Sequence, residues 1–195
     1  MKRFIDIFFS LLGLLFLIPF FIVISLLIII DSKGGTFYKQ VRVGLNNNDF
    51  YLLKFRSMKT NADKNGLLTV GAKDSRITKI GYKLRKYKLD ELPQLINVLK
   101  GDMSLVGPRP EVRKYVDLYN EKQLKVLSVK PGITDYASLK FFNENKILGK
   151  SSTPEETYIK EIMPIKLDLN LKYINEYSTF TDVKIILKTL KKIIN

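Results

Sequence analysis

The chain has 195 residues, with 33 Lys and Arg against 19 Asp and Glu, so its formal net charge is +14. This charge favours anionic partners such as phosphorylated substrates, lipid surfaces or nucleic acid. The chain contains no His and no Cys, which excludes an imidazole base, a thiolate nucleophile, an ordinary zinc site and disulfides. An enzyme of this composition has to rely on Asp, Glu, Lys, Tyr, Ser or a bound metal.

Residues 4–30 form a nearly unbroken apolar run after Lys2-Arg3. The run is long enough to span a hydrocarbon core roughly 30 Å thick. Pro19 divides it into two pieces, each near the depth of one leaflet at about 1.5 Å per residue. A proline kink therefore makes a hairpin that enters and leaves the same face geometrically available. Basic residues flank both ends, so the positive-inside rule sends neither end across. The residues alone leave a spanning helix and a re-entrant hairpin equally open.

A β-hairpin is predicted for residues 36–58. Alternating apolar and polar residues precede an Asn-rich turn at 46–49, and an aromatic-rich segment returns from it. Lys54 and Arg56 are expected on the same side of the returning strand. The polar, turn-rich residues 60–76 are typical of a surface loop.

The remaining segments outside the candidate site are read from their hydrophobic periodicity and their Pro and Gly positions. They are a basic amphipathic segment at 77–88, a surface helix at 111–129, a strand or loop at 133–142, a loop at 143–154, a helical pattern interrupted near Pro164 at 155–176, and an amphipathic helix at 181–194. The last of these can dock on the core or lie in a membrane interface.

The candidate site lies in residues 85–111. The acidic pair Asp90-Glu91 follows a basic cluster, and a short apolar helix pattern leads to Gly107-Pro108-Arg109-Pro110. The two prolines stiffen the backbone around Arg109 and present its guanidinium in a rigid loop. Carboxylates among fixed cations suit phosphate chemistry, in which a carboxylate attacks or binds metal. Each motif alone also has a structural interpretation, as a helix start and as a tight turn.

Several motifs in order resemble the bacterial sugar transferases of the monotopic phosphoglycosyl transferase family, nearly from end to end. The resemblance rests on Lys2-Arg3 with Asp6 before the proline-broken apolar run, Gln40-Val41-Arg42-Val43-Gly44, Lys54-Phe55-Arg56-Ser57-Met58, Arg85, Leu89-Asp90-Glu91-Leu92-Pro93-Gln94-Leu95, Asn97-Val98-Leu99-Lys100-Gly101-Asp102-Met103-Ser104, Gly107-Pro108-Arg109-Pro110 and Lys130-Pro131-Gly132-Ile133-Thr134.

This resemblance implies a reaction and the residues that perform it. The family moves a sugar phosphate from a UDP-sugar to undecaprenyl phosphate and releases UMP, with Mg²⁺ as cofactor. By position, Asp90 would be the nucleophile that forms an aspartyl-phosphosugar intermediate, with Mg²⁺ near it, and Glu91 its acidic partner. The implied phosphate-binding residues are Arg85, Arg109, Lys54 and Arg56, and the implied structural loop residues are Gly107, Pro108 and Pro110.

The resemblance also implies an architecture. Residues 1–31 would form a re-entrant membrane hairpin broken at Pro19, and residues 32–195 a catalytic domain on the cytoplasmic face of the bacterial inner membrane. The expected fold is α/β (α+β): a small membrane-associated domain with a short antiparallel hairpin and surrounding amphipathic helices. Many family members carry a small polar residue, often Ser, before the proline. Here Ile18 takes that place, so the kink depends on proline alone.

Two other functions fit parts of the sequence. A non-catalytic cationic adaptor could use the same apolar run and C-terminal helix to bind anionic lipid. A membrane-tethered nucleic-acid binder is suggested by charge alone, but no nucleic-acid-binding motif supports it, and no nucleic-acid partner is expected. The sequence specifies neither the sugar nor the oligomeric state. Ile133 to Ser138 is our hypothesis for part of the sugar selectivity.

Overall fold

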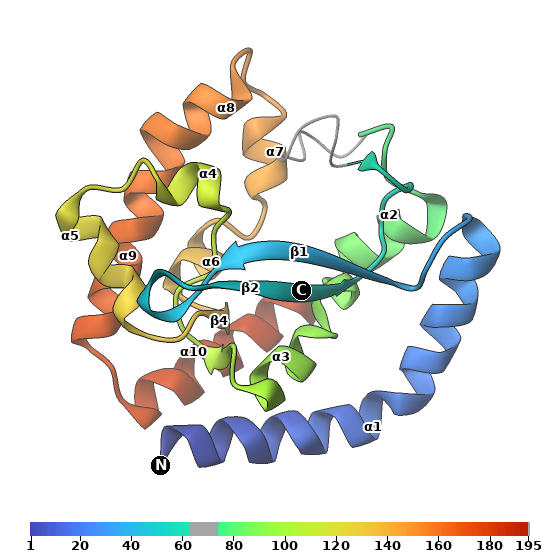
Figure 1. Cartoon of the computed structure of the whole chain (residues 1–195), viewed down its shortest axis with the longest axis horizontal. Coiled ribbons are helices and arrows are strands. Elements are labelled where there is room, and N and C mark those ends of the chain that lie inside the picture. Colours follow the sequence, from blue (N-terminus) through green and yellow to red (C-terminus); the bar gives the residue numbers. More distant parts are fainter. Residues whose placement is uncertain (63–73, 195) are drawn as a thin grey trace.

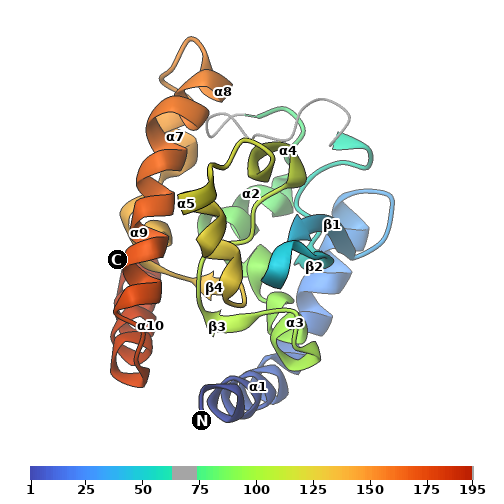
Figure 2. The same ribbon diagram turned by 60° about the vertical axis from the view of Figure 1, so that its left-hand side comes forward.

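The computed structural model describes residues 1–62 and 74–194, so most of the loop predicted at 60–76 lies outside the described residues. The described chain is mostly helical, with a short antiparallel hairpin and one long apolar helix at its N-terminus (Figure 1). The predicted α/β class is therefore confirmed. Helix α9 (Met163–Asn175) lies on one flank of the domain and the second half of α1 (Lys2–Asp31) on the opposite flank (Figure 2).

Helix α1 covers Lys2–Asp31 and contains Pro19. Its first half runs beneath the domain and its second half rises along the side, with the bend near the middle of the helix (Figure 1). Among the described residues, it is the one helix long and apolar enough to cross a membrane. Most of its apolar side chains are exposed, but Ile24 and Ile28 pack against Phe55 and Leu84. One side of α1 is therefore part of the protein core.

Polar contacts join the first turns of α1 to the domain. Lys2 Nζ donates to the carbonyl of Val106 at 3.0 Å and lies 2.6 Å from a carboxylate oxygen of Asp182. The buried carboxylate of Asp6 accepts from the amide of Leu105 at 3.0 Å. The opposite end of α1 is held as well, because its Asp31 carboxylate accepts from the amide of Ile80 in α2 (Lys79–Lys86), at 3.0 Å. Both ends of the apolar helix therefore contact the same domain.

The predicted hairpin is confirmed as β1 (Phe37–Val43) and β2 (Asp49–Phe55), which pair antiparallel. A short 3₁₀ turn joins them. Asn46 and Asn47 in this turn have φ of 54° and 63°, a left-handed conformation that asparagine tolerates better than most residues.

A second, parallel pair consists of β3 (Ser104–Val106) and β4 (Gly132–Thr134). The loop after β3 lies against the start of β4. A Cβ on Gly132 would lie 2.0 Å from the amide nitrogen of Gly107, and one on Gly107 would lie 2.5 Å from the carbonyl oxygen of Lys130. Only glycine allows the two backbones to approach this closely.

The helices account for most of the remaining chain. They are α2 (Lys79–Lys86), α3 (Gln94–Lys100), α4 (Arg113–Val116), α5 (Glu121–Leu124), α6 (Tyr136–Lys140), α7 (Glu144–Leu148), α8 (Pro154–Thr157), α9 (Met163–Asn175) and α10 (Thr179–Ile194). The basic amphipathic segment at 77–88 contains α2, and the amphipathic helix predicted at 181–194 is confirmed as α10.

Two sequence predictions in this region were wrong. The single surface helix expected at 111–129 is instead α4, α5 and a 3₁₀ turn, because Asn120 forms a capping box with Gln123 that restarts the helix. The loop expected at 143–154 contains α7. Residues 133–142, which read as strand or loop, form the end of β4 followed by α6.

The interruption expected near Pro164 lies just before it. A π-helical turn, Tyr158–Ile162, leads into α9, and Pro164 occupies the first turn of that helix, where its missing amide costs little. Tyr158 and Leu167 are buried in the largest core cluster together with Tyr115. This core supports α9 behind the candidate site.

Candidate active site

Asp90 and Glu91 lie in a short 3₁₀ turn, Leu89–Glu91, between α2 and α3. The buried side chain of Asn97 on α3 forms hydrogen bonds with the backbone of β2. Its side-chain oxygen accepts from the amide of Leu53 at 2.9 Å, and its side-chain nitrogen donates to the carbonyl of Tyr51 at 2.8 Å. These bonds tie α3 to β2 and bring the next strand residue, Lys54, to the acidic turn.

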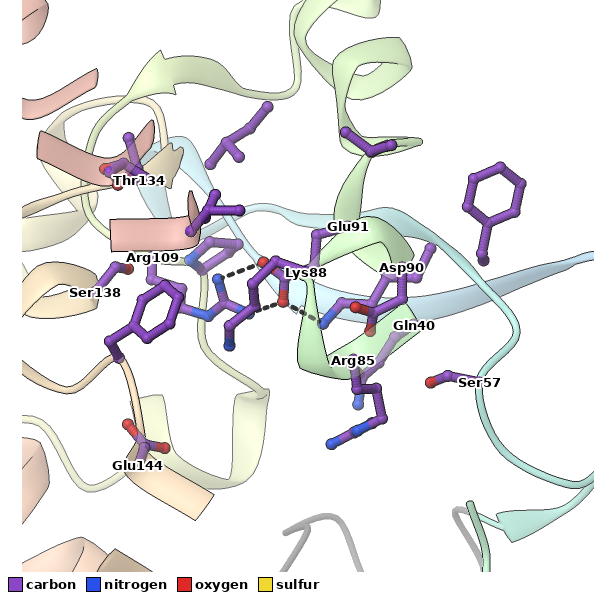
Figure 3. A pocket seen from close by; sticks show the side chains of 18 of the residues that line it. Gln40, Ser57, Arg85, Lys88, Asp90, Glu91, Arg109, Thr134, Ser138 and Glu144 are labelled. Carbon is purple, nitrogen blue, oxygen red and sulfur yellow. Dashed lines mark hydrogen bonds and ion pairs between the residues drawn. The ribbon is translucent and has the colours of Figure 1, made fainter. Parts of the chain in front are cut away.

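Glu91 is the centre of an ion triad. Lys54 Nζ donates to Glu91 Oε1 at 3.1 Å, and Arg109 Nη1 donates to Oε2 at 3.0 Å. Arg109 Nη2 donates to Oε1 as well, so the guanidinium and carboxylate meet through two bonds (Figure 3). Burial favours a raised pKa at Glu91, but the charges of Arg109 and Lys54 outweigh it and hold the pKa well below its ordinary value. Glu91 is therefore ionised and fixed in place.

The side chain of Asp90, the residue directly before Glu91, has a different environment. Its side chain is buried, and no described residue forms a hydrogen bond with its carboxylate. Burial and the charge of Glu91 raise the pKa of Asp90, against the opposing charges of Lys54 and Arg85. Figure 3 shows Asp90 on the opposite side of Glu91 from Arg109, with Arg85 of α2 close by. Asp90 is thus the carboxylate that the protein itself leaves available.

The loop that carries Arg109 is held by neighbours on both sides. The amide of Gly107 donates to the carbonyl of Thr134 at 3.1 Å, and the carbonyl of Pro108 accepts from the amide of Gly132 at 2.9 Å. The amide of Arg109 itself donates to buried Asp135 at 3.3 Å. These bonds support the predicted structural role of Gly107 and Pro108.

Pro110 ends this loop, and its carbonyl accepts from Arg42 Nη1 at 3.1 Å. Because Pro110 also stiffens the backbone on the other side of Arg109, the guanidinium projects from a segment with little freedom to move. The rigid presentation expected from the sequence agrees with this geometry.

Arg56, a predicted phosphate contact, lines the cavity but has its guanidinium bound to backbone carbonyls. Its guanidinium is largely buried and donates to the carbonyls of Ile28 at 3.3 Å, Ser32 at 2.6 Å and Lys33. The carbonyl of Ile28 also accepts from the amide of Ser32 at 3.2 Å, whereas Ser32 and Lys33 lie just beyond the end of α1, where backbone acceptors lack helical partners. Arg56 therefore caps α1, and the structure does not bring its guanidinium to the carboxylate pair.

The acidic turn opens into a large cavity of about 1410 Å³. Its polar wall contains Lys54, Arg85, Lys88, Asp90, Glu91 and Arg109. Its apolar wall contains side chains from α1, α3 and α10, namely Phe9, Leu95, Ile186, Leu187 and Leu190. The cavity can therefore receive a molecule with a charged end and an apolar end.

The donor set around Asp90 suits a magnesium ion that arrives with its substrate. The described residues bring together no group of three or more carboxylates. Mg²⁺ in proteins is commonly held by only one or two carboxylates, with phosphate oxygens and waters completing the shell. Asp90 can provide such a ligand, whereas Glu91 already holds two cations.

A second ionic network lies behind the Arg109 loop, and sequence reasoning did not assign it a role. Glu111 Oε1 accepts from Arg42 at 3.0 Å, and Tyr158 donates to Glu111 Oε2. Lys166 Nζ donates to the Tyr158 hydroxyl at 3.2 Å and lies 3.0 Å from Glu144. Burial favours a raised pKa at Glu111, but Arg42 and Lys166 hold the pKa below its ordinary value.

The sequence contained a partial signal for this network. Arg42 lies within one motif that carried the family resemblance, and Glu111 directly follows another. Glu144 lies in a segment predicted as a loop, and Lys166 lies in a helix pattern that looked interrupted. Nothing in their spacing pointed to a common site.

The family model described as bacterial sugar transferase matches residues 1–195. The chain therefore belongs to the bacterial sugar transferase family.

The chain matches different shares of the length of its individual relatives. The chain is 40% identical to the uncharacterized sugar transferase EpsL of Bacillus subtilis over 89% of this chain and 78% of that protein. It is 35% identical to the UDP-N-acetylgalactosamine-undecaprenyl-phosphate N-acetylgalactosaminephosphotransferase of Aeromonas hydrophila, over 99% of this chain and 43% of that protein. It is 36% identical to the UDP-glucose:undecaprenyl-phosphate glucose-1-phosphate transferase of Escherichia coli, over 98% of this chain and 40% of that protein. The chain thus spans less than half the length of the last two relatives.

Proposed function

We propose that this protein transfers a sugar phosphate from a UDP-sugar to undecaprenyl phosphate and releases UMP. The observation that carries the proposal is the unequal pair of carboxylates. Glu91 is fixed by Lys54 and Arg109, while the adjacent Asp90 is buried among cations without a hydrogen bond from any described residue. Such a carboxylate is suited to nucleophilic attack on phosphorus. The activities for which the Aeromonas and Escherichia relatives are named support the same reaction.

The reaction proceeds in two displacements. A carboxylate oxygen of Asp90 attacks the phosphorus that is bonded to the sugar. An aspartyl–phosphorus bond forms, and the bond from that phosphorus to the bridging oxygen breaks, so that UMP leaves with the bond electrons. A phosphate oxygen of the lipid then attacks the same phosphorus and releases the Asp90 carboxylate. Arg109 and Arg85 hold the phosphate oxygens, and Glu91 keeps Arg109 and Lys54 in position.

We propose Asp90 together with the substrate phosphates as the ligands of Mg²⁺. When bound there, the ion would offset negative charge on the diphosphate. Asp90 would keep one oxygen toward the phosphorus, and the surrounding cations would favour its ionised form.

The apolar wall of the cavity supports a lipid acceptor. Residues of α1 and α10 continue the cavity away from the acidic turn, and the exposed apolar face of α10 includes Leu187 and Leu190. An isoprenoid chain can lie against this wall while its phosphate reaches the cations. We also propose that this face of α10 rests in the membrane interface, as amphipathic helices with lysines on the polar face do.

We further propose that α1 is re-entrant and that the domain lies on the cytoplasmic face of the inner membrane. A straight helix of 30 residues is about 45 Å long and would place its ends on opposite sides of a core roughly 30 Å thick. Both ends of α1 contact one domain, which supports a hairpin bent near Pro19. The basic flanks support a cytoplasmic location for both ends.

The proposed function is tested with the purified full-length protein and UDP-glucose, UDP-galactose, UDP-N-acetylglucosamine and UDP-N-acetylgalactosamine, each without acceptor. With its correct donor, the wild-type protein should release about one UMP per chain and gain the mass of one phosphosugar. Undecaprenyl phosphate should then discharge the adduct. Asp90→Asn should form no adduct, because an amide is a poor nucleophile, and Glu91→Gln should be severely impaired.

Asp117→Asn is the matched control, because Asp117 is exposed and distant from the acidic turn in sequence; it should behave like the wild type. Turnover that requires both substrates together and never yields an adduct would refute the covalent route. If no donor yields UMP with or without acceptor while the protein still binds anionic vesicles, the adaptor function replaces the enzymatic one.

A further inference from the structure

The pair formed by Glu144 and Lys166 has no role in the proposed displacement. Glu144 begins α7 and Lys166 lies on α9, and both line the same cavity as Asp90. Figure 3 shows Glu144 on the Arg109 side of the ion triad, away from Asp90. The charge of Glu144 acts on Arg109, where it contributes to a raised pKa after the larger effect of Glu91. The pair therefore lies near the phosphate-binding cations but apart from the nucleophile.

Each member of the pair lines the cavity and retains one hydrogen-bonding position that no described residue uses. Glu144 Oε2 is 3.0 Å from Lys166 Nζ, and no described residue donates to Glu144 Oε1. Lys166 Nζ has two acceptors among the described residues, Glu144 and the hydroxyl of Tyr158 at 3.2 Å. An ammonium carries three N–H donors, so one remains. A strong acceptor and a strong donor thus stand next to each other.

Tyr158 and its hydrogen-bond partners hold the pair in position. The side chain of Lys166 is only 13% exposed, and its Nζ lies 4.9 Å from the centre of the Tyr158 ring. Tyr158 is buried and donates to Glu111, which binds Arg42. A chain of hydrogen bonds therefore runs from Glu144 to the residue that holds the carbonyl of Pro110. Such a supported pair is preorganised for a ligand, which reduces the ordering cost of binding.

We propose that Glu144 and Lys166 bind neighbouring hydroxyl groups of the nucleotide-sugar donor. One hydroxyl can donate to the carboxylate of Glu144, and the neighbouring hydroxyl can accept from the ammonium of Lys166. Hydrogen bonds between a hydroxyl and a charged group are stronger than those between neutral groups. The hydroxyls belong either to the ribose or to the transferred sugar, since the donor carries both. This inference rests on the proposed function and assigns it a specificity-determining site.

The test compares Glu144→Gln with the wild type and with Glu156→Gln, measuring UMP release from the four UDP-sugars named above and inhibition by UMP. Glu156 is an exposed carboxylate paired with Lys160 one turn away, so its substitution should change nothing. Glu144→Gln should raise the KM for the preferred donor about tenfold, as expected for loss of a charged hydrogen bond, and change kcat less than twofold. An unchanged inhibition constant for UMP would assign the hydroxyls to the transferred sugar, and an equal increase would assign them to ribose.

The proposal is overturned if KM, UMP inhibition and the ranking of donors in Glu144→Gln all match the wild type. It is also overturned if kcat falls with KM and ranking unchanged. If Glu144→Gln does not fold, Glu144→Asp replaces it, since this variant keeps the charge but withdraws the carboxylate by one methylene, and the same KM increase is expected. A wild-type protein that releases UMP normally while these variants show no effect refutes only this inference. Absence of UMP from the wild type with every donor refutes the proposed function itself.

Discussion

At the scale of single residues, the paired hydrogen bonds between Arg109 and Glu91 make the identity of the cation important. A guanidinium can hold Glu91 with two donors and still direct others toward a phosphate. Lysine carries the same charge, but its ammonium cannot reproduce this planar arrangement. We therefore expect Arg109→Lys to lower kcat/KM by roughly 100-fold, the size of effect seen when a preorganised donor is lost. The measurement is UMP release with saturating acceptor.

The control for Arg109→Lys is Arg113→Lys. Arg113 is an arginine nearby in sequence, paired with Asp49 at the surface, and its substitution should leave kcat/KM unchanged. Both variants should have the melting temperature of the wild type within a few degrees. Near-normal turnover in Arg109→Lys would remove this residue from the site.

The lowered pKa of the Glu111 carboxylate predicts that the stability of the protein depends on pH. Its pKa is lowered in the folded protein, chiefly because Arg42 and Lys166 outweigh the opposing effect of burial. A carboxylate whose pKa is lowered on folding stabilises the folded state. This stabilisation is complete above the ordinary pKa of 4.5 and is lost as the pH falls through the pKa of the folded state. We expect Glu111→Gln to lower the free energy of unfolding by about 1–3 kcal/mol at pH 7, and by less in acid.

Chemical denaturation of the wild type and Glu111→Gln between pH 7 and pH 3 measures this effect. The difference between the two proteins should narrow as the pH falls. Glu121→Gln, which changes an exposed carboxylate in the first turn of α5, serves as control. A difference that widens toward acid would contradict the assigned charge state of Glu111.

At the scale of elements, α1 gives a prediction about topology. The chain has no native cysteine, so single cysteines at Lys2 and Lys33 report the two ends of α1 without background. In intact cells, a membrane-impermeant maleimide should label neither variant, and after permeabilisation it should label both. Pro19→Ala restores a helical hydrogen bond and weakens the kink, so a fraction of this variant should become labelled at position 2 from outside. If the single cysteines at positions 2 and 33 are labelled from opposite sides of the membrane in proteins that retain Pro19, α1 is a spanning helix.

The elements also show where sequence reasoning succeeds and where it fails. The hairpin and α10 were predictable because a period of two and a period of 3.6 are local signals. The break between α4 and α5 depends on one side chain, Asn120, whose reciprocal bonds with Gln123 outweigh an apolar pattern that continues across them. The parallel pairing of β3 with β4 was not predicted, because each strand has only three residues.

The candidate site was predictable to a similar extent. Asp90, Glu91 and Arg109 could be grouped because they lie close together in the sequence beside rigid residues. Arg56 could not be excluded, because the cap it forms on α1 depends on contacts across more than 20 residues. Lys54 lies two residues before Arg56 and does reach the site, so neighbouring cations of one strand segment have separate roles.

At the scale of the whole molecule, the first and last helices are joined by a polar contact. Asp182 of α10 accepts from Lys2 at 2.6 Å and from the hydroxyl of Tyr173 at 2.7 Å. We expect Asp182→Asn to lower the free energy of unfolding by about 1–3 kcal/mol, because Lys2 would lose its charged partner. Thermal denaturation in a lipid nanodisc measures the change. Asp168→Asn, which removes an exposed carboxylate 3.7 Å from Lys122, should have no effect, and equal melting temperatures for both variants would contradict the role assigned to Asp182.

The contact between Lys2 and Asp182 also imposes an order on biosynthesis, because 180 residues separate its two members. At a translation rate of about 5–20 residues per second, roughly 10 to 40 seconds pass between the synthesis of one partner and of the other. During that interval the ribosome still holds the chain, and α1 can already contact Phe55, Ile80 and Leu105, which are made well before Asp182. The charged end of α1 at Lys2 therefore lacks its carboxylate partner until α10 has been made, although the rest of α1 can pack earlier.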